Sequence, residues 1–112
     1  ARENFSCFTS QFCLVGHSHV PLVFSHEEDG PYSAGRFSDN VKLILGTSRL
    51  IINPGAVGQP RDGDPQASYA LYDSQIGIMK LYRVPYDIRV TQDKMVERRL
   101  PTRQVARLSQ GM

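Results

Sequence analysis

Short hydrophobic blocks separated by turn residues fill the first three quarters of the chain. The blocks are rich in Val, Ile, Leu, Tyr and Phe, and clusters of Gly, Pro, Asp and Ser stand between them. Short runs of β-branched and aromatic residues bounded in this way favour strands over helices. We predict strands at residues 12–15, which we expect to be buried, and at residues 20–24, 41–45, 50–52, 68–72 and 76–84.

Turn chemistry predicts how these strands are connected. Residues 26–36 (HEEDGPYSAGR) combine charged side chains with two glycines and a proline, so we expect a loop there. Residues 46–48 form the turn between the two strands on either side of them. Residues 73–75 form the turn of a hairpin that joins the last two strands.

After Pro85 the pattern changes from strands to helices. Asp87 is suited to cap a helix that stops near Arg99, and Thr102 to cap a shorter one that is closed by Gly111. The fold class predicted is therefore α+β, rich in strands and with helices at the C-terminus. The residues expected to face inward are Ile88, Thr91 and Met95 in the first helix and Val105, Ala106 and Leu108 in the second.

Composition places the chain among single globular domains. It has 112 residues, of which 40% are hydrophobic and 21% charged, so it can bury a core and is not wholly disordered. The formal net charge of +2 is too small to indicate a nucleic-acid or membrane partner. No apolar run approaches the roughly 20 residues of a transmembrane helix, and the first residues lack the order of a secretory signal.

The charge is nevertheless uneven along the chain. Residues 1–79 carry 5 basic and 8 acidic side chains, whereas residues 80–112 carry 8 basic and 3 acidic ones. A surface that binds single-stranded nucleic acid would interleave aromatic residues with this positive charge, and none follows Tyr86. We favour a solvated face of the C-terminal helices over a nucleic-acid-binding tail.

The two cysteines, Cys7 and Cys13, are six residues apart. This spacing fits neither a CxxC redox pair nor a zinc site, and two cysteines make a poor disulfide framework. We predict that both are small core residues in a protein of the reducing cytoplasm.

His17 and His19 follow the first predicted strand within the sequence Gly16-His17-Ser18-His19. In an extended segment, residues i and i+2 point to the same side, about 6–7 Å apart. Two such imidazoles could bind one metal between them or serve two metals with one ligand each. The alternative is a pair of hydrogen-bonded histidines at a strand end without a chemical role.

The segment 53–65 (NPGAVGQPRDGDP) follows a hydrophobic strand and is too rich in Pro and Gly to extend it. Pro54-Gly55 fits the central pair of a type II turn, and Arg61 could clamp a phosphate bidentately. The alternative is a rigid connection in which Arg61 pairs with Asp62 or Asp64. The run of polar residues at 26–29 (HEED) is a further metal-ligand pattern, which is more typical of a solvated loop.

Several of these blocks together resemble the C-terminal half of the calcineurin-like metallophosphoesterase family. Residues 15–21 (VGHSHVP) are similar to its GHSH or GHTH block, followed by the Val-Pro often seen in bacterial members. Residues 52–61 (INPGAVGQPR) are similar to its INPGSVGQPR block, with Ala56 where Ser is commoner, and residues 62–70 (DGDPQASYA) continue the match. The tail from residue 100 to residue 111 also fits. The blocks occur in the same order over nearly the whole chain, which is far more specific than the two histidines alone.

The resemblance implies a fold, a site and a reaction. The fold is a four-layer α/β/β/α sandwich, whose site holds two divalent metals (Mn, Fe, Ni or Zn). His17 is expected to be a ligand of one metal and His19 of the other, while Asn53 and Arg61 are expected to contact a small phosphorylated substrate. In this family a hydroxide bridging the metals attacks phosphorus, which hydrolyses phosphomonoesters, phosphodiesters or nucleotides.

The chain also departs from the family pattern. The DxH, GDxxD and GNHD or GNHE blocks, which supply the other metal ligands and the histidine thought to protonate the leaving group, do not occur in it. We therefore expect residues 1–112 to be the C-terminal portion of a larger domain. Alone, it should be inactive and prone to self-association through exposed sheet edges. The main alternative function is that of a non-catalytic scaffold with the phosphoesterase fold, which would bind proteins.

Overall fold

The computed structural model describes residues 2–112, and in this range strands dominate and two α-helices stand at the C-terminal end. This arrangement confirms the predicted α+β class. The elements are the 3-10 helix η1 (Glu3–Cys7), the strands β1 (Phe12–Leu14), β2 (Pro21–His26), β3 (Tyr32–Arg36), β4 (Lys42–Ile44), β5 (Arg49–Pro54), β6 (Ala67–Asp73) and β7 (Ile78–Val84), and the helices α1 (Ile88–Glu97) and α2 (Thr102–Leu108).

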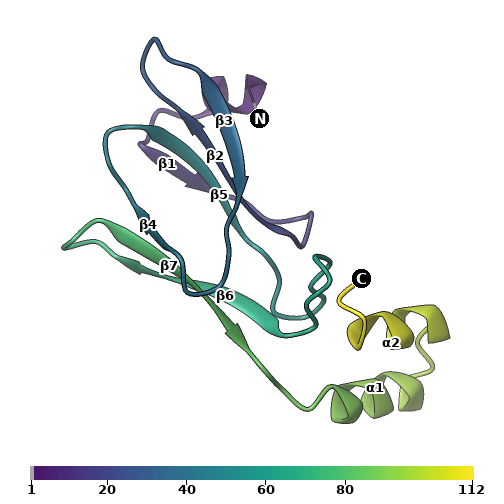
Figure 1. Cartoon of the computed structure of the whole chain (residues 1–112). Coiled ribbons are helices and arrows are strands. Elements are labelled where there is room, and N and C mark those ends of the chain that lie inside the picture. The colour runs from purple at the N-terminus through teal and green to yellow at the C-terminus, as the bar shows by residue number, and fades with distance from the viewer. Residues whose placement is uncertain (1) are drawn as a thin grey trace.

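The strands form two sheets that pack face to face (Figure 1). One sheet has the order β1-β5-β2-β3, in which only the β1–β5 pair is parallel. The other has the order β4-β7-β6 and is antiparallel throughout. Helices α1 and α2 lie together at one end of the sheets.

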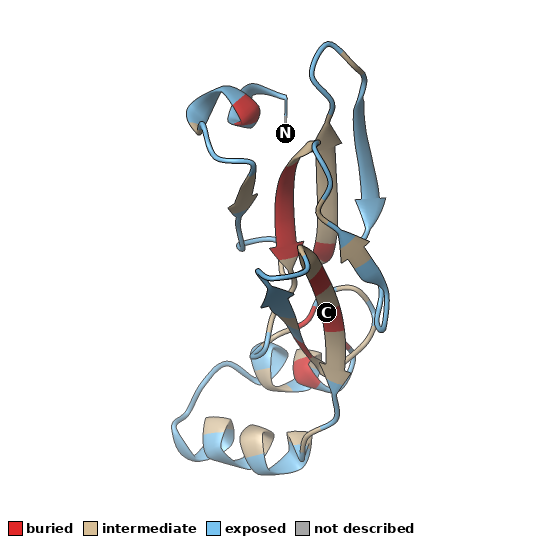
Figure 2. Ribbon diagram, turned by 90° about the vertical axis from the view of Figure 1, so that its left-hand side faces the viewer, coloured by how far each residue is buried: buried red, intermediate tan, exposed pale blue. Residues whose placement is uncertain are grey.

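A small hydrophobic core fills the space between the sheets. Figure 2 shows that burial is concentrated in β5 and β7. The chain measures 52 × 28 × 19 Å and has a radius of gyration of 16.3 Å, compared with roughly 13 Å for a compact domain of this length. The structure is thus elongated for its size. The buried core residues are Phe37, Leu50, Ile52, Met79 and Leu81.

The order of the first sheet determines where its loops meet. Strands β1 and β2 lie on opposite sides of β5, so the connection between them crosses the carboxyl end of β5. The register places the start of β2, Pro21, opposite Pro54 at that same end. The loop after β1 and the loop after β5 therefore meet at one edge of the sheet.

Two predictions about the strands are wrong. The loop expected at residues 26–36 contains strand β3, whose residues are all exposed and which pairs with β2 at the edge of the sheet. An edge strand exposed on both faces needs no hydrophobic alternation, so its polar sequence does not reveal it. Strand β1, expected to be buried, is also an edge strand, and Leu14 is 57% exposed.

The predicted connections have different outcomes. Strands β6 and β7 form the expected antiparallel hairpin, with the turn at residues 74–77. Residues 46–48 connect β4 with β5, as predicted, and because these two strands belong to different sheets the connection is a crossover.

The first C-terminal helix agrees with its prediction better than the second. The side chain of Asp87 accepts hydrogen bonds from the backbone N–H groups of Arg89 and Val90, which confirms it as the cap of α1. Thr102 is the first residue of α2 rather than its cap, because the helix begins directly after Pro101. Ala106, expected to face inward, is exposed. Within residues 2–112, neither α-helix has the length and apolar character needed to cross a bilayer.

The two cysteines are free, and they are not core residues as predicted. Cys7 is exposed at the end of η1, where the buried side chain is that of Phe5, and Cys13 is only half-buried on edge strand β1. The hydrophobic residues that flank each cysteine in the sequence do not cover it in space, so neither thiol is buried.

We predict that the core between the sheets dominates stability. Leu81→Ala removes a fully buried side chain and should lower the free energy of unfolding by about 3 kcal/mol. Leu71→Ala is the matched control, because Leu71 is 56% exposed on the neighbouring strand and should cost less than about 0.5 kcal/mol. Urea denaturation measures both, and equal losses would contradict the assigned core.

Candidate metal-binding site

Two loops meet at the carboxyl end of β5. We call residues 15–20, between β1 and β2, the histidine loop, and residues 55–66, between β5 and β6, the β5–β6 loop. The histidine loop starts by extending the β1–β5 ladder, since the Val15 N–H donates to the Ile52 carbonyl at 2.9 Å. The four residues singled out in the sequence, His17, His19, Asn53 and Arg61, all lie in or directly beside these two loops.

Both histidines adopt left-handed backbone conformations. The φ angle is +75° at His17 and +60° at His19, so the predicted extended geometry of this segment is wrong. A non-glycine residue in this region costs on the order of 1–3 kcal/mol and persists only where the surroundings enforce it. The orientation of the two rings therefore depends on contacts made by the loop and not on the pleat of a strand.

The ring of His19 is oriented by a backbone carbonyl of the other loop. Its Nδ1 lies 2.7 Å from the carbonyl oxygen of Gln59. Because a carbonyl can only accept a hydrogen bond, Nδ1 carries the proton, and the lone pair of a neutral ring is then on Nε2. A histidine that binds a metal typically donates its other N–H to a carbonyl or carboxylate in this way.

His17 and His19 supply two donors that fit a transition metal or zinc. The side chain of His17 is exposed, and no described residue hydrogen-bonds to its ring. Within residues 2–112, no group of three or more His, Cys, Asp and Glu side chains is placed to hold a metal. Two imidazoles are fewer ligands than a protein metal site ordinarily has.

Asn53 lies at the end of β5, beneath the histidine loop, and is 2% exposed. Its Nδ2 group donates to the Gly16 carbonyl at 3.0 Å and lies 2.8 Å from the hydroxyl oxygen of Ser18. Its Oδ1 accepts a hydrogen bond of 2.9 Å from the N–H of Gly55. The amide thus connects the histidine loop with the first residue of the β5–β6 loop.

Gly55 is the residue at which the chain turns out of β5. Its φ of +84° lies in the left-handed region that favours glycine. Pro54, predicted to share a type II turn with Gly55, is the last residue of β5, so the turn type stays a prediction. A Cβ atom here would lie 2.8 Å from Pro21 Cγ and 2.9 Å from the hydroxyl oxygen of Ser68. Conformation and close packing therefore both require glycine.

Arg61 contributes to the site through its backbone as well as its side chain. Its N–H donates to the carbonyl of His19 at 3.1 Å, while its exposed guanidinium donates to Gln59 Oε1 at 3.1 Å. The alternative in which Arg61 pairs with Asp62 or Asp64 is wrong, because both carboxylates pair with another arginine.

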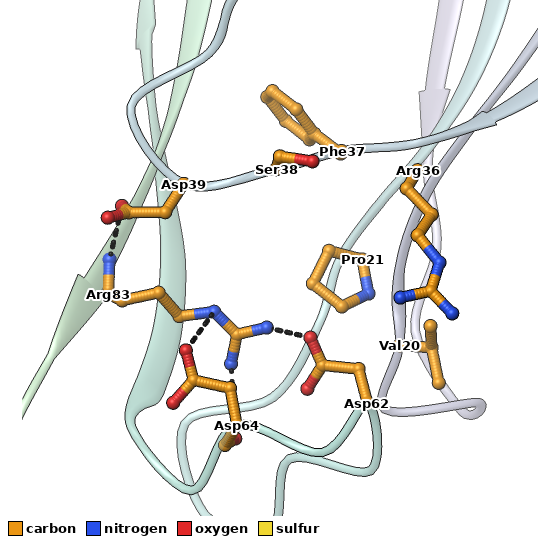
Figure 3. A pocket seen from close by; sticks show the side chains of 9 residues that line it. All are labelled: Val20, Pro21, Arg36, Phe37, Ser38, Asp39, Asp62, Asp64 and Arg83. Carbon is orange, nitrogen blue, oxygen red and sulfur yellow. Dashed lines mark hydrogen bonds and ion pairs between the residues drawn. The ribbon is translucent and has the colours of Figure 1, made fainter.

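That arginine is Arg83 on β7, which the sequence reasoning missed. Its guanidinium is 6% exposed, pairs with Asp62, and approaches a carboxylate oxygen of Asp64 to 3.7 Å. It also donates to the Gln66 carbonyl at 3.0 Å, and the backbone N–H of Arg83 donates to Asp39 at 2.9 Å. Figure 3 shows Arg83 and its three acidic partners, Asp39, Asp62 and Asp64, lining a pocket of about 160 Å³.

The sequence contains a signal that could have identified Arg83. Strand residues alternate between faces, so Arg83 shares the inward face of β7 with Met79 and Leu81, which are core residues. A cation on the inward face of a strand needs a buried partner of opposite charge. The acidic residues of the DGDP segment are candidates for that partner, although Asp73 and Asp87 are closer to Arg83 in the sequence.

The C-terminus holds the β5–β6 loop from its other side. The Gly111 carbonyl accepts a hydrogen bond of 3.0 Å from the N–H of Gly63. Gly111 has a φ of +65°, as expected for a residue that closes a helix, and a Cβ there would lie 2.7 Å from the backbone nitrogen of Asp64. The end of α2 is thus packed directly onto this loop.

The third histidine does not belong to the site. His26 pairs with Arg49 at the start of β5, whereas the histidine loop crosses the other end of that strand. Its ring stacks on Tyr32 with a centroid distance of 4.0 Å. The metal-ligand pattern at residues 26–29 is therefore far from His17 and His19 along the sheet.

Comparison with known proteins agrees in sequence and in structure. The family model described as a calcineurin-like phosphoesterase superfamily domain matches residues 1–77. An uncharacterised protein of Methanocaldococcus jannaschii is 43% identical over 89 residues, which are 79% of this chain and 34% of that protein. The crystal structure of a metallophosphoesterase from Sphaerobacter thermophilus matches with a TM-score of 0.89 at 42% identity, over 96% of this chain and 45% of that one. The chain therefore spans less than half the length of either protein.

We predict that Arg83 is the main electrostatic support of the β5–β6 loop. Arg83→Met should lower the free energy of unfolding by about 3 kcal/mol, because it leaves the mostly buried carboxylate of Asp62 without its partner. Arg61→Met is the matched control, since the same change at an exposed guanidinium should cost less than about 0.5 kcal/mol. Chemical denaturation of both variants measures the difference, and similar losses would contradict the assigned role.

Proposed function

The chain belongs to the calcineurin-like phosphoesterase superfamily, and we propose that it supplies part of the active site of a metal-dependent hydrolase that acts on phosphomonoesters, phosphodiesters or nucleotides. The observation that carries the proposal is the hydrogen bond from His19 Nδ1 to the Gln59 carbonyl. This bond leaves the lone pair on Nε2 free to bind a metal. Such a bond from the other ring nitrogen to a carbonyl is typical of metal-binding histidines.

His17 and His19 are the residues of this chain that would hold metal. Imidazole nitrogen suits Mn, Fe, Ni and Zn alike, so the identity of the ions is open. When bound, two divalent ions supply Lewis-acid chemistry, in which they lower the pKa of water and neutralise charge on the phosphoryl oxygens. The two histidines would determine the positions of the ions. The histidine loop that carries them would be kept in place by its contacts with the end of β5.

Arg61 is the residue that would bind the phosphate of the substrate. Its guanidinium is exposed and, among residues 2–112, hydrogen-bonds to the side chain of Gln59, whose backbone carbonyl also orients His19. A guanidinium offers several N–H donors in a planar fork, so it can bind two phosphate oxygens while it keeps one bond to Gln59. Arg61 would thus orient substrate next to the histidines without taking part in proton transfer.

We propose that the remaining metal ligands lie outside residues 1–112, in a longer intact protein. The Methanocaldococcus protein and the Sphaerobacter metallophosphoesterase are each more than twice as long as the segment that they share with this chain. We expect residues 1–112 alone to bind metal weakly and to be inactive. The two free cysteines accord with the proposed cytoplasmic location, where thiols stay reduced.

The test is hydrolysis of p-nitrophenyl phosphate and bis(p-nitrophenyl) phosphate by the intact protein with Mn²⁺. His17→Ala and His19→Ala should each lower kcat/KM by more than about 100-fold, because loss of a partner behind a ligand already costs 10–100-fold. His26→Gln is the matched control at the far end of the sheet and should leave kcat/KM within about twofold.

Three outcomes would contradict the proposal. An intact protein that neither retains metal nor hydrolyses either ester would instead favour the non-catalytic scaffold. Activity unaffected by both histidine substitutions would remove His17 and His19 from the site. Full activity of residues 1–112 alone would contradict the expectation that further ligands are required.

A further inference from the structure

We infer that Asn53 is the positioning residue of this site: its buried amide sets the conformation of the histidine loop and makes no contact with substrate. The inference replaces the substrate contact expected from the sequence. It rests on the proposed function only for the identity of the ligand that the two histidines take.

The topology explains why a residue at this place has such influence. The histidine loop must cross β5 because β1 and β2 lie on opposite sides of it. Asn53 is the last residue but one of β5 and therefore lies under the crossing. A side chain there can reach the loop from below while the loop's outer side stays open.

The hydrogen bonds of Asn53 bracket His17. One Nδ2 contact is with the Gly16 carbonyl, just before this histidine, and the other is with the Ser18 hydroxyl, just after it. One contact holds a backbone carbonyl before His17, whose φ is +75°, and the other holds the side chain of the residue after it. The left-handed conformation of His17 is therefore held by the amide of Asn53 together with a local bond, in which the Ser18 N–H donates to the same Gly16 carbonyl at 3.0 Å.

The amide cannot turn over to present its oxygen to the histidine loop. Its Oδ1 accepts from the N–H of Gly55, whereas a turned amide would set Oδ1 against the Gly16 carbonyl, which cannot donate a hydrogen bond. Only an amide offers two N–H donors and one acceptor from a single short side chain. A carboxylate of the same shape keeps the acceptor and loses both donors.

Asn53 has no atom left for a substrate. The residue is 2% exposed, and its nitrogen and its oxygen are both engaged within the protein. By contrast, the side chains of His17 and Arg61 are exposed. The site is thus divided into exposed groups that meet ligands and one buried group that holds them in place.

The test is Asn53→Asp in the intact, metal-depleted protein, titrated with Mn²⁺ by calorimetry near pH 7.5. The affinity for Mn²⁺ should fall by about 10-fold to 100-fold, the loss typical of partners behind metal ligands. The added negative charge alone would attract the cation, so a fall must come from lost geometry. At saturating Mn²⁺, the KM for the aryl phosphate should stay within about twofold of wild type.

A readout without metal makes the test independent of the proposed function. The ¹³Cα and ¹⁵N chemical shifts of His17 report its left-handed backbone and should move toward ordinary loop values in Asn53→Asp. Gln75→Glu is the matched control, because it makes the same change of amide to carboxylate at the exposed hairpin turn, and it should alter neither shifts nor affinity.

A second variant covers the case in which Asn53→Asp does not fold. Ser18→Ala removes one of the two partners of Nδ2 at an exposed position and should lower Mn²⁺ affinity by roughly threefold to tenfold. A raised KM with unchanged Mn²⁺ affinity and unchanged His17 shifts would overturn the inference in favour of a substrate contact. A different result would contradict the proposed function but not this inference. In that case His19→Ala would bind Mn²⁺ as tightly as wild type, and Asn53→Asp would still change the chemical shifts of His17.

Discussion

The crossing of the histidine loop over the end of β5 is the constraint on which the rest of the site depends. Strands β1 and β2 flank β5, so residues 15–20 have to bridge a strand that lies between them. A bridge this short brings two histidines into left-handed conformations, which isolated residues avoid. The histidine loop is stabilised by hydrogen bonds to the residues beneath and beside it, which are Asn53 and Gln59.

The same constraint explains why residues far from the histidines matter. The Gln59 carbonyl orients His19 only if the β5–β6 loop is itself rigid, and that loop is held from two sides. Arg83 binds its acidic residues from the second sheet, and Gly111 packs on it from the C-terminal helix. Both sheets and the C-terminal helix α2 thus help to position the imidazoles of His17 and His19. They do so although the core between the sheets is small.

Local patterns in the sequence predicted the parts that local chemistry determines. The β6–β7 hairpin, the Asp87 cap and the turn at Gly55 follow from turn and capping preferences within a few residues. The motif containing His17 and His19 could be found, but its conformation could not, because the loop is held by contacts with Asn53, Gln59 and Arg61, more than thirty positions away in the sequence. Strand β3 was missed because both its faces are exposed, and Arg83 because its partners lie on another element.

The most direct test of this account is the tautomer of His19 in the intact, metal-free protein, read from long-range ¹H–¹⁵N correlations of the ring at a pH where it is neutral. The account predicts a single tautomer with the proton on Nδ1 and a bare Nε2, because Nδ1 donates to the Gln59 carbonyl. A ring protonated on Nε2, or one that exchanges freely between the two forms, would contradict the claim that the two loops hold His19 ready to bind a metal.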